Sequence, residues 1–332
     1  MRLRLSLIAG LVFSTAALAD YSHHPKVPEL LSLLKDEYGF TDADLAGVTQ
    51  ALAQAEAQPK LIQAEQQAKE KTLTWDEYRR IHIFDKNLKN GARFLQDNRK
   101  WLAKAEAEYG VPPAIVAAIL GVETKFGTYA SPHRALDALA TQGFEHPTRS
   151  AFFFRELAEF FVLCKENRWK PETVRGSYAG AVGSAQFMPS NYRRFAVDFD
   201  GDGVRDLWKT PDAIGSIANY LVSYAPQKGW QRGLPIAVPA SLKSKPGDDW
   251  PLNTKAQTHY VADFLRVGVH PAVALPLDTP AGLLDLTVAN GHEYWIGLHN
   301  FYSVMTYNPR VYYAMAVTQL AEALQLQQES PQ

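Results

Sequence analysis

Two stretches of this 332-residue chain contain residues whose types and spacing could do chemistry. The first holds Glu123, the only acid in an otherwise almost wholly apolar run over residues 111–127. A carboxyl group beside buried apolar surface, near the negative end of a helix dipole, is disfavoured in its ionised form, so its pKa would rise. A carboxyl that stays protonated near neutral pH can act as a general acid. The alternative is a solvated glutamate on a frayed last turn.

The second stretch is acidic and runs from Asp198 to Gly203, followed by Asp206. Its carboxylates and its glycine match the start of an EF-hand loop, in which oxygen ligands wrap Ca²⁺. Lys209 stands where such loops end in glutamate, and Asp212, three residues later, could close the site instead. The alternative is a solvated acidic turn, but we expect a structural calcium ion. The expected ligands are Asp198, Asp200, Asp202 and the backbone carbonyl of Val204, and Asp212 would join them if the loop is longer than usual.

A helix must place Glu123, and its neighbours predict one. Pro112 and Pro113 suit a first helical turn, where a missing N–H costs nothing. Apolar residues then recur at helical spacing as far as Val122, and Gly127 suits the end. Because this helix is apolar on nearly all sides, we expect it to be buried.

Helical patterns dominate the first 230 residues. A capping box from Thr74 to Glu77 opens a helix that we expect to end near Gly91. The aromatic run from Ser150 to Cys164 predicts a core helix. Further helices are expected within residues 20–68, 92–109, 134–141, 211–229 and 310–325.

Two regions depart from this pattern. Residues 175–189 hold three glycines among small residues, which indicates either a loop presenting Gln186 in a cleft or a tight structural turn. From Gly233 onward, prolines and short β-prone runs predict a small β-rich insertion with a turn at Asn290–Gly291. Residues 301–308 combine aromatic rings with amides, which suit either a sugar site or an ordinary core.

These patterns predict a mainly α (α+β) protein with four regions. We expect a signal peptide at 1–19, a helical region with the catalytic core and calcium loop at 20–230, and a β-rich domain at 231–300. Residues 301–332 would form a C-terminal helix that completes the core, followed by a polar tail.

Composition limits the function classes. The formal charge of −1 gives no basic field for nucleic acid. Two arginines, an apolar run and Ala17-Leu-Ala19 indicate a signal peptide cleaved after Ala19, since the apolar run is too short for a membrane anchor. The only cysteine, Cys164, lies far from this segment, so neither a disulfide nor a lipid anchor is expected. We therefore expect a soluble, periplasmic protein.

Taken together, these stretches resemble the lytic murein transglycosylase B family, glycoside hydrolase family 103. Five collinear motifs between about residues 74 and 320 support the resemblance. They are Gly121–Gly127, Ser177–Ser190, Asp198–Gly203 with Leu207-Trp208, Asp212–Tyr220, and Asn300-Phe301 with Tyr307-Asn308 and Tyr313–Val317.

The resemblance implies a lysozyme-like helical core, an extra helical region and a small β-domain. It implies cleavage of the β-1,4 bond between N-acetylmuramic acid and N-acetylglucosamine in peptidoglycan, leaving 1,6-anhydro ends. Glu123 matches the family's single catalytic acid, and Asp212 matches the last carboxylate of its calcium loop. Matching positions also imply that substrate contacts come from Ser177, Gln186, Tyr78, Tyr220, Tyr307, Asn308, Tyr313 and Arg149.

Such an enzyme would act as a monomer on glycan strands, with other cell-wall enzymes as further partners. Three rival functions remain open. A lysozyme-type hydrolase would use the same acid with a water molecule, and a peptidoglycan-binding protein would release no products. A calcium-responsive adaptor is the third, and the single calcium loop argues against it.

Overall fold

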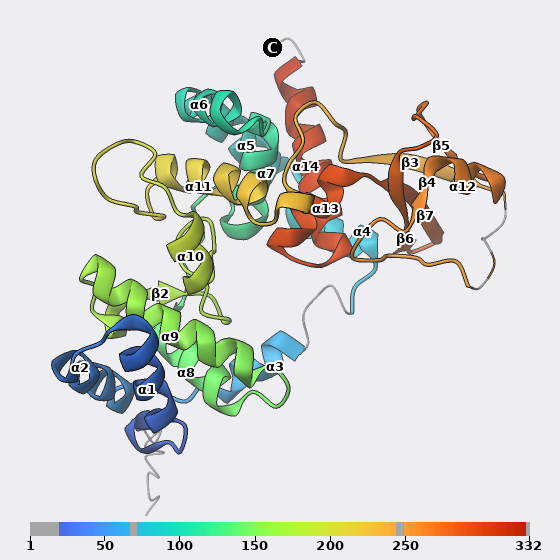
Figure 1. Ribbon diagram of the computed structural model, residues 1–332. Coiled ribbons are helices and arrows are strands. Elements are labelled where there is room, and N and C mark those ends of the chain that lie inside the picture. Colours follow the sequence, from blue (N-terminus) through green and yellow to red (C-terminus); the bar gives the residue numbers. More distant parts are fainter. Residues whose placement is uncertain (1–19, 67–71, 244–246, 248, 330–332) are drawn as a thin grey trace, which may run out of the picture.

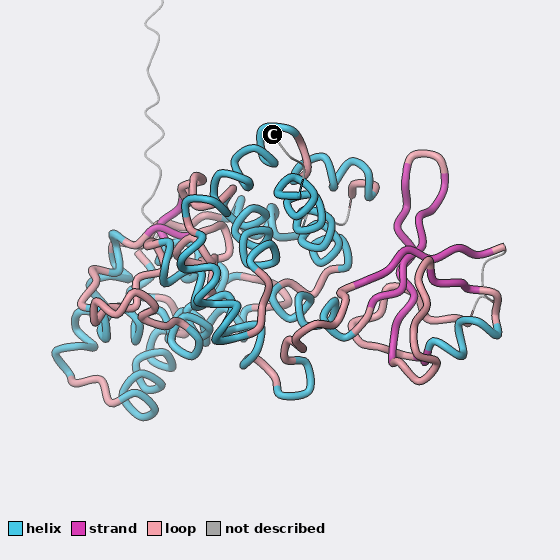
Figure 2. The backbone as a smooth tube through the Cα atoms, turned by 90° about the horizontal axis from the view of Figure 1, so that it is seen from above, coloured by secondary structure: helices cyan, strands magenta, loops and turns pink. Residues whose placement is uncertain are grey.

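The structure is a computed structural model, and it describes residues 20–66, 72–243, 247 and 249–329. The expected signal peptide and the last three residues of the polar tail lie outside these ranges. The described chain has two helical layers, a two-stranded sheet among them, and a five-stranded sheet at one end (Figures 1 and 2). The expectation of a mainly α protein with a small β-rich part is confirmed.

The first helical layer combines the N-terminal helices with two later ones that pack on them (Figure 1). A capping box between Thr41 and Asp44 starts the second helix. Phenylalanines make the longest helix of this layer a core element, as its sequence predicts. The elements are η1 (Tyr21–His23), α1 (Val27–Tyr38), α2 (Asp42–Ala53), α3 (Pro59–Gln66), α8 (Ala135–Glu145) and α9 (Ser150–Asn167).

The second layer surrounds the helix that carries Glu123. That helix is α7 (Pro113–Thr124), and the other helices of the layer pack either against it or against its direct neighbours. Those helices are α4 (Trp75–His82), α5 (Asp85–Asp97), α6 (Arg99–Tyr109), α11 (Thr210–Ser223), α13 (His299–Tyr307) and α14 (Val311–Glu329).

Two predicted helix boundaries in this layer are wrong. The capping box at Thr74 does open α4, but α4 ends at His82 rather than near Gly91. Gly91 lies inside α5, where it allows other side chains to approach the helix closely. The single helix expected over 92–109 is therefore the end of α5 followed by α6.

Short irregular segments connect the layers. β1 (His133–Arg134) pairs with β2 (Arg175–Gly176), and β2 leads into the glycine-containing loop. The loop runs into α10 (Pro189–Phe195), and the acidic stretch then connects α10 with α11. Two further short turns are η3 (Pro171–Thr173) and η4 (Pro226–Lys228).

The β-rich part is a five-stranded antiparallel sheet with strand order β4-β6-β7-β3-β5. The Asn290–Gly291 turn joins β6 to β7, as the sequence predicts. A short helix, α12 (Val261–Arg266), was not expected there. The strands are β3 (Ala237–Leu242), β4 (His259–Tyr260), β5 (Val269–Pro271), β6 (Pro280–Val288) and β7 (Gly291–Gly297).

Two hydrophobic cores stabilise the described chain. The larger one joins both helical layers and includes one face of β6, through Leu284 and Leu286. The smaller one belongs to the sheet and includes Leu283 and Phe264. Successive strand residues point to opposite faces, so β6 contributes to both cores.

No single helix among the described residues is long and apolar enough to cross a membrane. By length and composition alone, the consecutive helices α6 and α7 pass that test as a pair, with a bend of 115° between them.

Candidate active site

The helix α7 brings Glu123 to the edge of the core. Nine of its twelve residues are buried, as its apolar composition predicts. Glu123 is half-buried in the last turn, and Thr124 beside it is fully enclosed, with 2% of its surface exposed. Lys125 ends the helix in a left-handed conformation, two residues before the expected stop at Gly127.

The turn after Glu123 is held by one aromatic ring. Lys125, Phe126 and Gly127 all have positive φ, which is uncommon for residues other than glycine. The buried ring of Phe126 lies so close to Gly91 and Gly121 that a Cβ on either glycine would come within 2.8 Å of it. Nothing in the sequence indicates this role for Phe126, whose ring packs the turn after the acid against α5 and α7.

Two tyrosines from the C-terminal helices contact the acid or one another. The Tyr313 hydroxyl donates a hydrogen bond of 2.7 Å to Oε1 of Glu123. The ring of Tyr307 lies parallel to that of Tyr313, with 6.3 Å between centroids and 9° between planes. Burial, and next the charge of Glu123, raise the pKa of both tyrosines well above the ordinary value. Both hydroxyls therefore stay protonated, and Tyr313 remains a donor to the acid.

The glycine-containing loop lies against the end of α7. The Thr124 hydroxyl donates to the carbonyl oxygen of Ser184 at 3.0 Å, and the Tyr307 hydroxyl donates to that of Ala185. Gln186 follows with a positive φ of 50°. Its Nε2 donates to Gly183 O at 2.8 Å and to Ser131 Oγ at 3.2 Å. The loop is thus a tight turn, and Gln186 is half-buried in it.

Ser177 shapes the start of this loop. Its hydroxyl oxygen accepts hydrogen bonds from the backbone N–H groups of Ala179 at 3.2 Å and Ala181 at 3.1 Å. Its own N–H donates to Ala181 O at 2.8 Å. Ser177 is half-buried, so the side chain combines loop support with partial access to solvent.

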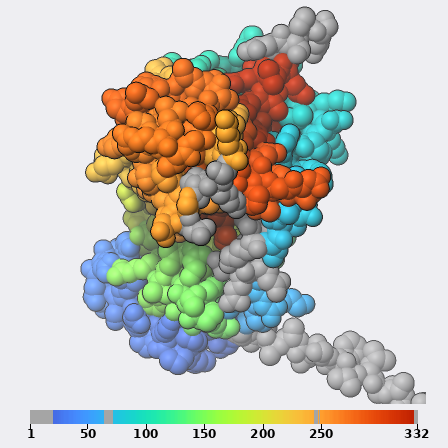
Figure 3. Space-filling view, turned by 90° about the vertical axis from the view of Figure 1, so that its right-hand side faces the viewer, coloured from blue at the N-terminus to red at the C-terminus, as the bar shows by residue number. Residues whose placement is uncertain are grey.

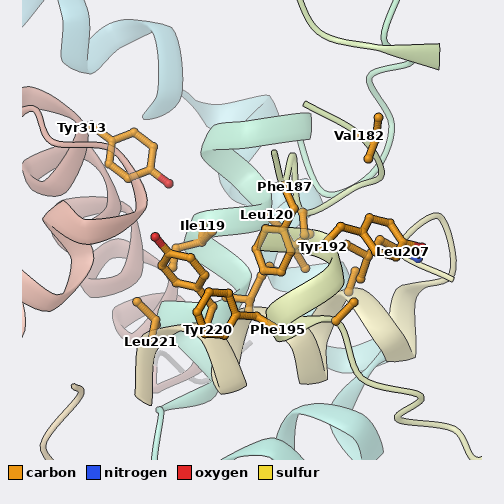
Figure 4. Packing of buried hydrophobic residues seen from close by; sticks show 14 of the residues in the cluster. Ile119, Leu120, Val182, Phe187, Tyr192, Phe195, Leu207, Tyr220, Leu221 and Tyr313 are labelled. Atoms are coloured by element: carbon orange, nitrogen blue, oxygen red, sulfur yellow. Dashed lines mark hydrogen bonds between the residues drawn. The ribbon is translucent and has the colours of Figure 1, made fainter. Parts of the chain in front are cut away.

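A cluster of aromatic side chains around Tyr220 packs against the glycine-containing loop. The Tyr220 hydroxyl donates to Thr306 O at 2.7 Å, and its ring lies 4.9 Å from that of Tyr307. Figure 4 shows Tyr220 packed among Phe187, Phe195 and residues of α7, while the Tyr313 hydroxyl points toward α7. Tyr220 is 2% exposed, so the structure places it in the core rather than on a cleft surface.

The remaining candidate residues lie at three different places. Tyr78 on α4 is buried, and its ring lies 5.8 Å from that of Tyr312, the neighbour of Tyr313 in sequence. Asn308 ends α13 and is half-buried beside Tyr307. Arg149 is exposed at the start of α9, on the other helical layer, where its guanidinium lies over Phe152 and Phe153.

The acidic stretch forms a compact turn that brings carboxylates together. Ligand oxygens of Asp198, Asp200 and Asp212 all lie within 4.8 Å of one another. Asp212 is fully buried and accepts hydrogen bonds from Phe199 N and Asp206 N, while burial raises its pKa. Carboxylates this close repel one another, and a cation bound between them would offset that repulsion. Ca²⁺ prefers hard oxygen donors such as these.

The other two expected ligands, Asp202 and Val204, lie in the same turn, and Asp202 already has a cationic partner. Asp202 is paired with Lys209, and that hydrogen bond lowers the pKa of Asp202. Its Oδ1 also accepts from Val204 N at 2.9 Å, which keeps Asp202 at the turn. Lys209 occupies the position at which such a loop usually ends in glutamate. Its positive charge offsets the negative charge of Asp202.

Cavity size does not identify this site. A cavity of about 1430 Å³ is lined by α5, α6, the end of α14 and Pro113, at the opposite end of α7 from Glu123. The space-filling view shows where the molecule is hollowed near the acid-bearing layer: dark red atoms of the C-terminal helices are visible between the orange β-rich part and the green α8–α9 layer (Figure 3).

Comparisons with known proteins show the family of this chain. A family model described as the transglycosylase SLT domain matches residues 28–322. The chain is 36% identical over 316 residues to the membrane-bound lytic murein transglycosylase B of Escherichia coli K12, covering 92% of this chain and 84% of the relative.

Solved structures give the same result. The Escherichia coli lytic transglycosylase Slt35 in complex with calcium has a TM-score of 0.84 at 35% identity, over 94% of this chain and 96% of that chain. SltB3 from Pseudomonas aeruginosa, in complex with NAG-anhNAM-pentapeptide, has a TM-score of 0.73 at 27% identity, over 90% and 79%. With the family model covering most of its length, this chain belongs to the transglycosylase SLT domain family.

Proposed function

We propose that this chain is a lytic murein transglycosylase that cleaves the β-1,4 bond between N-acetylmuramic acid and N-acetylglucosamine in peptidoglycan and leaves 1,6-anhydro ends. The observation that carries the proposal is Glu123, half-buried at the end of α7 and hydrogen-bonded by Tyr313. The names of the relatives support the reaction, and the NAG-anhNAM-pentapeptide bound to SltB3 supports the product.

The first step needs an acid. Glu123 donates its proton to the glycosidic oxygen, which leaves as the hydroxyl of N-acetylglucosamine. The N-acetyl carbonyl oxygen of the muramic acid attacks C1 as that bond breaks, so an oxazolinium ion carries the positive charge. Because the neighbouring acetamido group supplies the nucleophile, the protein does not need the second carboxylate that two-carboxylate glycosidases use.

The second step needs a base. Glu123, now ionised, removes the proton from the C6 hydroxyl of the same muramic acid. The C6 oxygen attacks C1, the oxazolinium ring opens, and the 1,6-anhydro sugar forms while Glu123 regains its proton. An intramolecular nucleophile has a high effective molarity, so it outcompetes water when it is held in position.

The substrate contacts that we propose fall into two groups. Ser177, Gln186 and Asn308 present partly exposed polar groups, which suit hydrogen bonds to sugar hydroxyl and acetamido groups. Tyr78, Tyr307 and Tyr313 would line the cleft on the side of the acid, and Tyr220 would support them from the core, where its hydroxyl donates to Thr306 O. Arg149, on the other layer, would contact the strand farther from the reacting bond.

We also propose a structural Ca²⁺ ion held by Asp198, Asp200, Asp202, Asp212 and the carbonyl of Val204. The three clustered carboxylates support this assignment, and Slt35 was solved in complex with calcium. The ion would supply positive charge that holds the carboxylates together. Asp202 would have to exchange its contact with Lys209 for the ion.

The chain would work outside the cytoplasm. Its first nineteen residues have the charge and apolar pattern of a signal peptide with cleavage after Ala19, which supports export to the periplasm. Its single cysteine, Cys164, is buried, which supports a form without a lipid anchor. Glycan strands are the proposed partner, other cell-wall enzymes are further candidates, nucleic acid is not, and we propose a monomer.

The variant Glu123→Gln tests the proposal. It keeps the size of the side chain and loses the proton donor, so the melting temperature should change little while release of products from purified sacculi falls at least about 10³-fold. Wild-type-like turnover by a folded Glu123→Gln variant would sink the assignment of Glu123. Binding of sacculi without release by the wild-type protein would instead favour a non-catalytic peptidoglycan-binding protein.

A further inference from the structure

The side chain next to the proposed acid joins two parts of the site. Thr124 is 2% exposed, and its Oγ1 lies 3.0 Å from Ser184 O, 3.3 Å from Leu120 O and 3.1 Å from Gly127 N. A hydroxyl has one proton to donate and lone pairs to accept with. Thr124 therefore accepts from Gly127 N and donates to one of the two carbonyl oxygens.

The hydrogen-bond geometry favours Ser184 as the acceptor. A threonine inside a helix usually donates to the carbonyl four residues earlier, which here is Leu120 O. That oxygen already accepts from the backbone N–H groups of Lys125 and Phe126. Ser184 O is also the closer of the two. The hydroxyl thus connects the last turn of α7 to the glycine-containing loop, 60 residues later in the chain.

A second contact holds the same loop from the other side. Tyr307 donates to Ala185 O, directly after Ser184, and its ring stacks on Tyr313, which donates to Glu123. Contacts therefore run from the acid through two tyrosines to the loop, and from the loop through Thr124 back to the residue beside the acid. This closed path fixes the carboxyl group relative to the loop that carries Gln186.

We propose that Thr124 is a positioning residue for Glu123, whose hydroxyl sets the distance between the acid and the loop through Ser184 O and supports the left-handed turn through Gly127 N. The inference rests on the proposed function of Glu123. Without the hydroxyl, the turn loses its acceptor and the loop its donor, so the carboxyl group can shift. A shift of about 1 Å at a reacting group can cost on the order of 10²-fold in rate.

Three substitutions at one position, with one control, test the proposal. Thr124→Val keeps the shape and removes the hydroxyl, and we expect kcat on purified sacculi to fall about 10- to 100-fold with KM changed less than about threefold. Thr124→Ser restores the hydroxyl and should recover kcat to within about threefold of wild type. Thr124→Cys has a weaker donor and should lie between them, which keeps the test available if the valine variant does not fold.

The matched control is Thr318→Val. Thr318 is 1% exposed on α14, and its hydroxyl donates at 2.8 Å to Ala314 O, four residues earlier in the same helix. It should lose as much thermal stability as Thr124→Val while keeping its kcat.

Each outcome decides a different question. Unchanged kcat in Thr124→Val, or in Thr124→Cys if the valine variant is unfolded, overturns the positioning role. An equal loss of kcat in Thr318→Val also overturns it, because the effect would then follow stability. If the wild-type protein releases no products, or Glu123→Gln stays active, the proposed function itself fails. An active wild type, an inactive Glu123→Gln and a fully active Thr124→Val would refute the role of Thr124 alone.

Discussion

Glu123 and Tyr313 come from positions 190 residues apart and form the central contact of the site. The hydrogen bond fixes one oxygen of the carboxyl group. The raised pKa of Tyr313 keeps its hydroxyl protonated at neutral and moderately alkaline pH, so the tyrosine can serve as donor but not as a base. It can therefore orient the carboxyl group, and in the proposed mechanism Glu123 transfers the proton to and from substrate.

The variant Tyr313→Phe should therefore lose rate more than stability. Removing the hydroxyl leaves Glu123 less well oriented, and we expect kcat on sacculi to fall about tenfold, which corresponds to the net strength of one hydrogen bond to a charged group. Tyr38→Phe is the matched control, because the Tyr38 hydroxyl donates to Glu159 at the same 2.7 Å, on α1 and α9. A similar rate in Tyr313→Phe and Tyr38→Phe would contradict the orienting role.

For single residues, the sequence could predict which residue types serve the site, but not which of their side chains contact one another. Glu123 was predictable because its apolar neighbours and the helix end are local features. Tyr313 could be named as a site residue by resemblance, but nothing local shows that its hydroxyl meets the acid. Thr124 was not predicted at all, since its partner at Ser184 comes from another part of the chain and only the folded structure brings them together.

At the scale of elements, α7 depends on close approach by its neighbours. Gly91 of α5 and Gly121 of α7 leave room for the ring of Phe126, and a Cβ on Gly91 would also come within 2.4 Å of Leu324 on α14. The sequence predicted Gly91 to be a helix end because glycine often ends helices. In the structure, Gly91 lies inside a helix, where it allows close packing by side chains that are distant in sequence.

Gly121→Ala should destabilise the protein. The added methyl would come within 2.7 Å of the Phe126 ring, and overpacking of this kind costs about 1–3 kcal/mol in the free energy of unfolding. Gly47→Ala is the matched control, because Gly47 is an exposed residue inside α2 with no atom within 4 Å of the new Cβ. It should stabilise by up to about 1 kcal/mol, since alanine favours helix. Chemical denaturation measures both, and the same sign for the two variants would contradict this packing.

The acidic turn is a second element that reaches the site. Its last part supplies Leu207, whose carbonyl accepts from Ser184 N at 2.8 Å, in the loop that Thr124 holds. The sequence predicted an acidic loop suited to calcium, because the spacing of acidic residues is local, and Asp212 does lie beside Asp198 and Asp200. The pairing of Lys209 with Asp202 was not predicted.

Calcium should therefore stabilise the fold. An ion present at about 100 times its Kd adds about 2.7 kcal/mol to the free energy of unfolding, so chelation should lower the melting temperature by several degrees. In Asp212→Asn this calcium-dependent shift should largely disappear. Asp137→Asn, a buried carboxylate paired with Arg134, should lower the melting temperature but keep the shift. If the melting temperature changes with neither calcium nor chelator, the structural ion is ruled out.

At the scale of the whole molecule, the site lies where distant parts of the chain meet. The end of α7, the loop of residues 175–189, the end of α13 and the start of α14 are joined by hydrogen bonds around Glu123. The sequence predicted the helical class and the β-rich insertion, because both depend on local periodicity and proline content. It could not predict how these parts pack, since that depends on the two cores and on glycine contacts between helices.

The most direct test is the mass of the products released from purified sacculi by the wild-type protein. If the C6 hydroxyl of muramic acid attacks its own C1, the released muropeptides carry 1,6-anhydro ends and are lighter by one water than hydrolysis products. We expect the wild-type protein to release products with anhydro ends, and we expect none of these products from Glu123→Gln. Products with reducing ends would show that water is the nucleophile, as in a lysozyme-type hydrolase, and would contradict the proposed reaction.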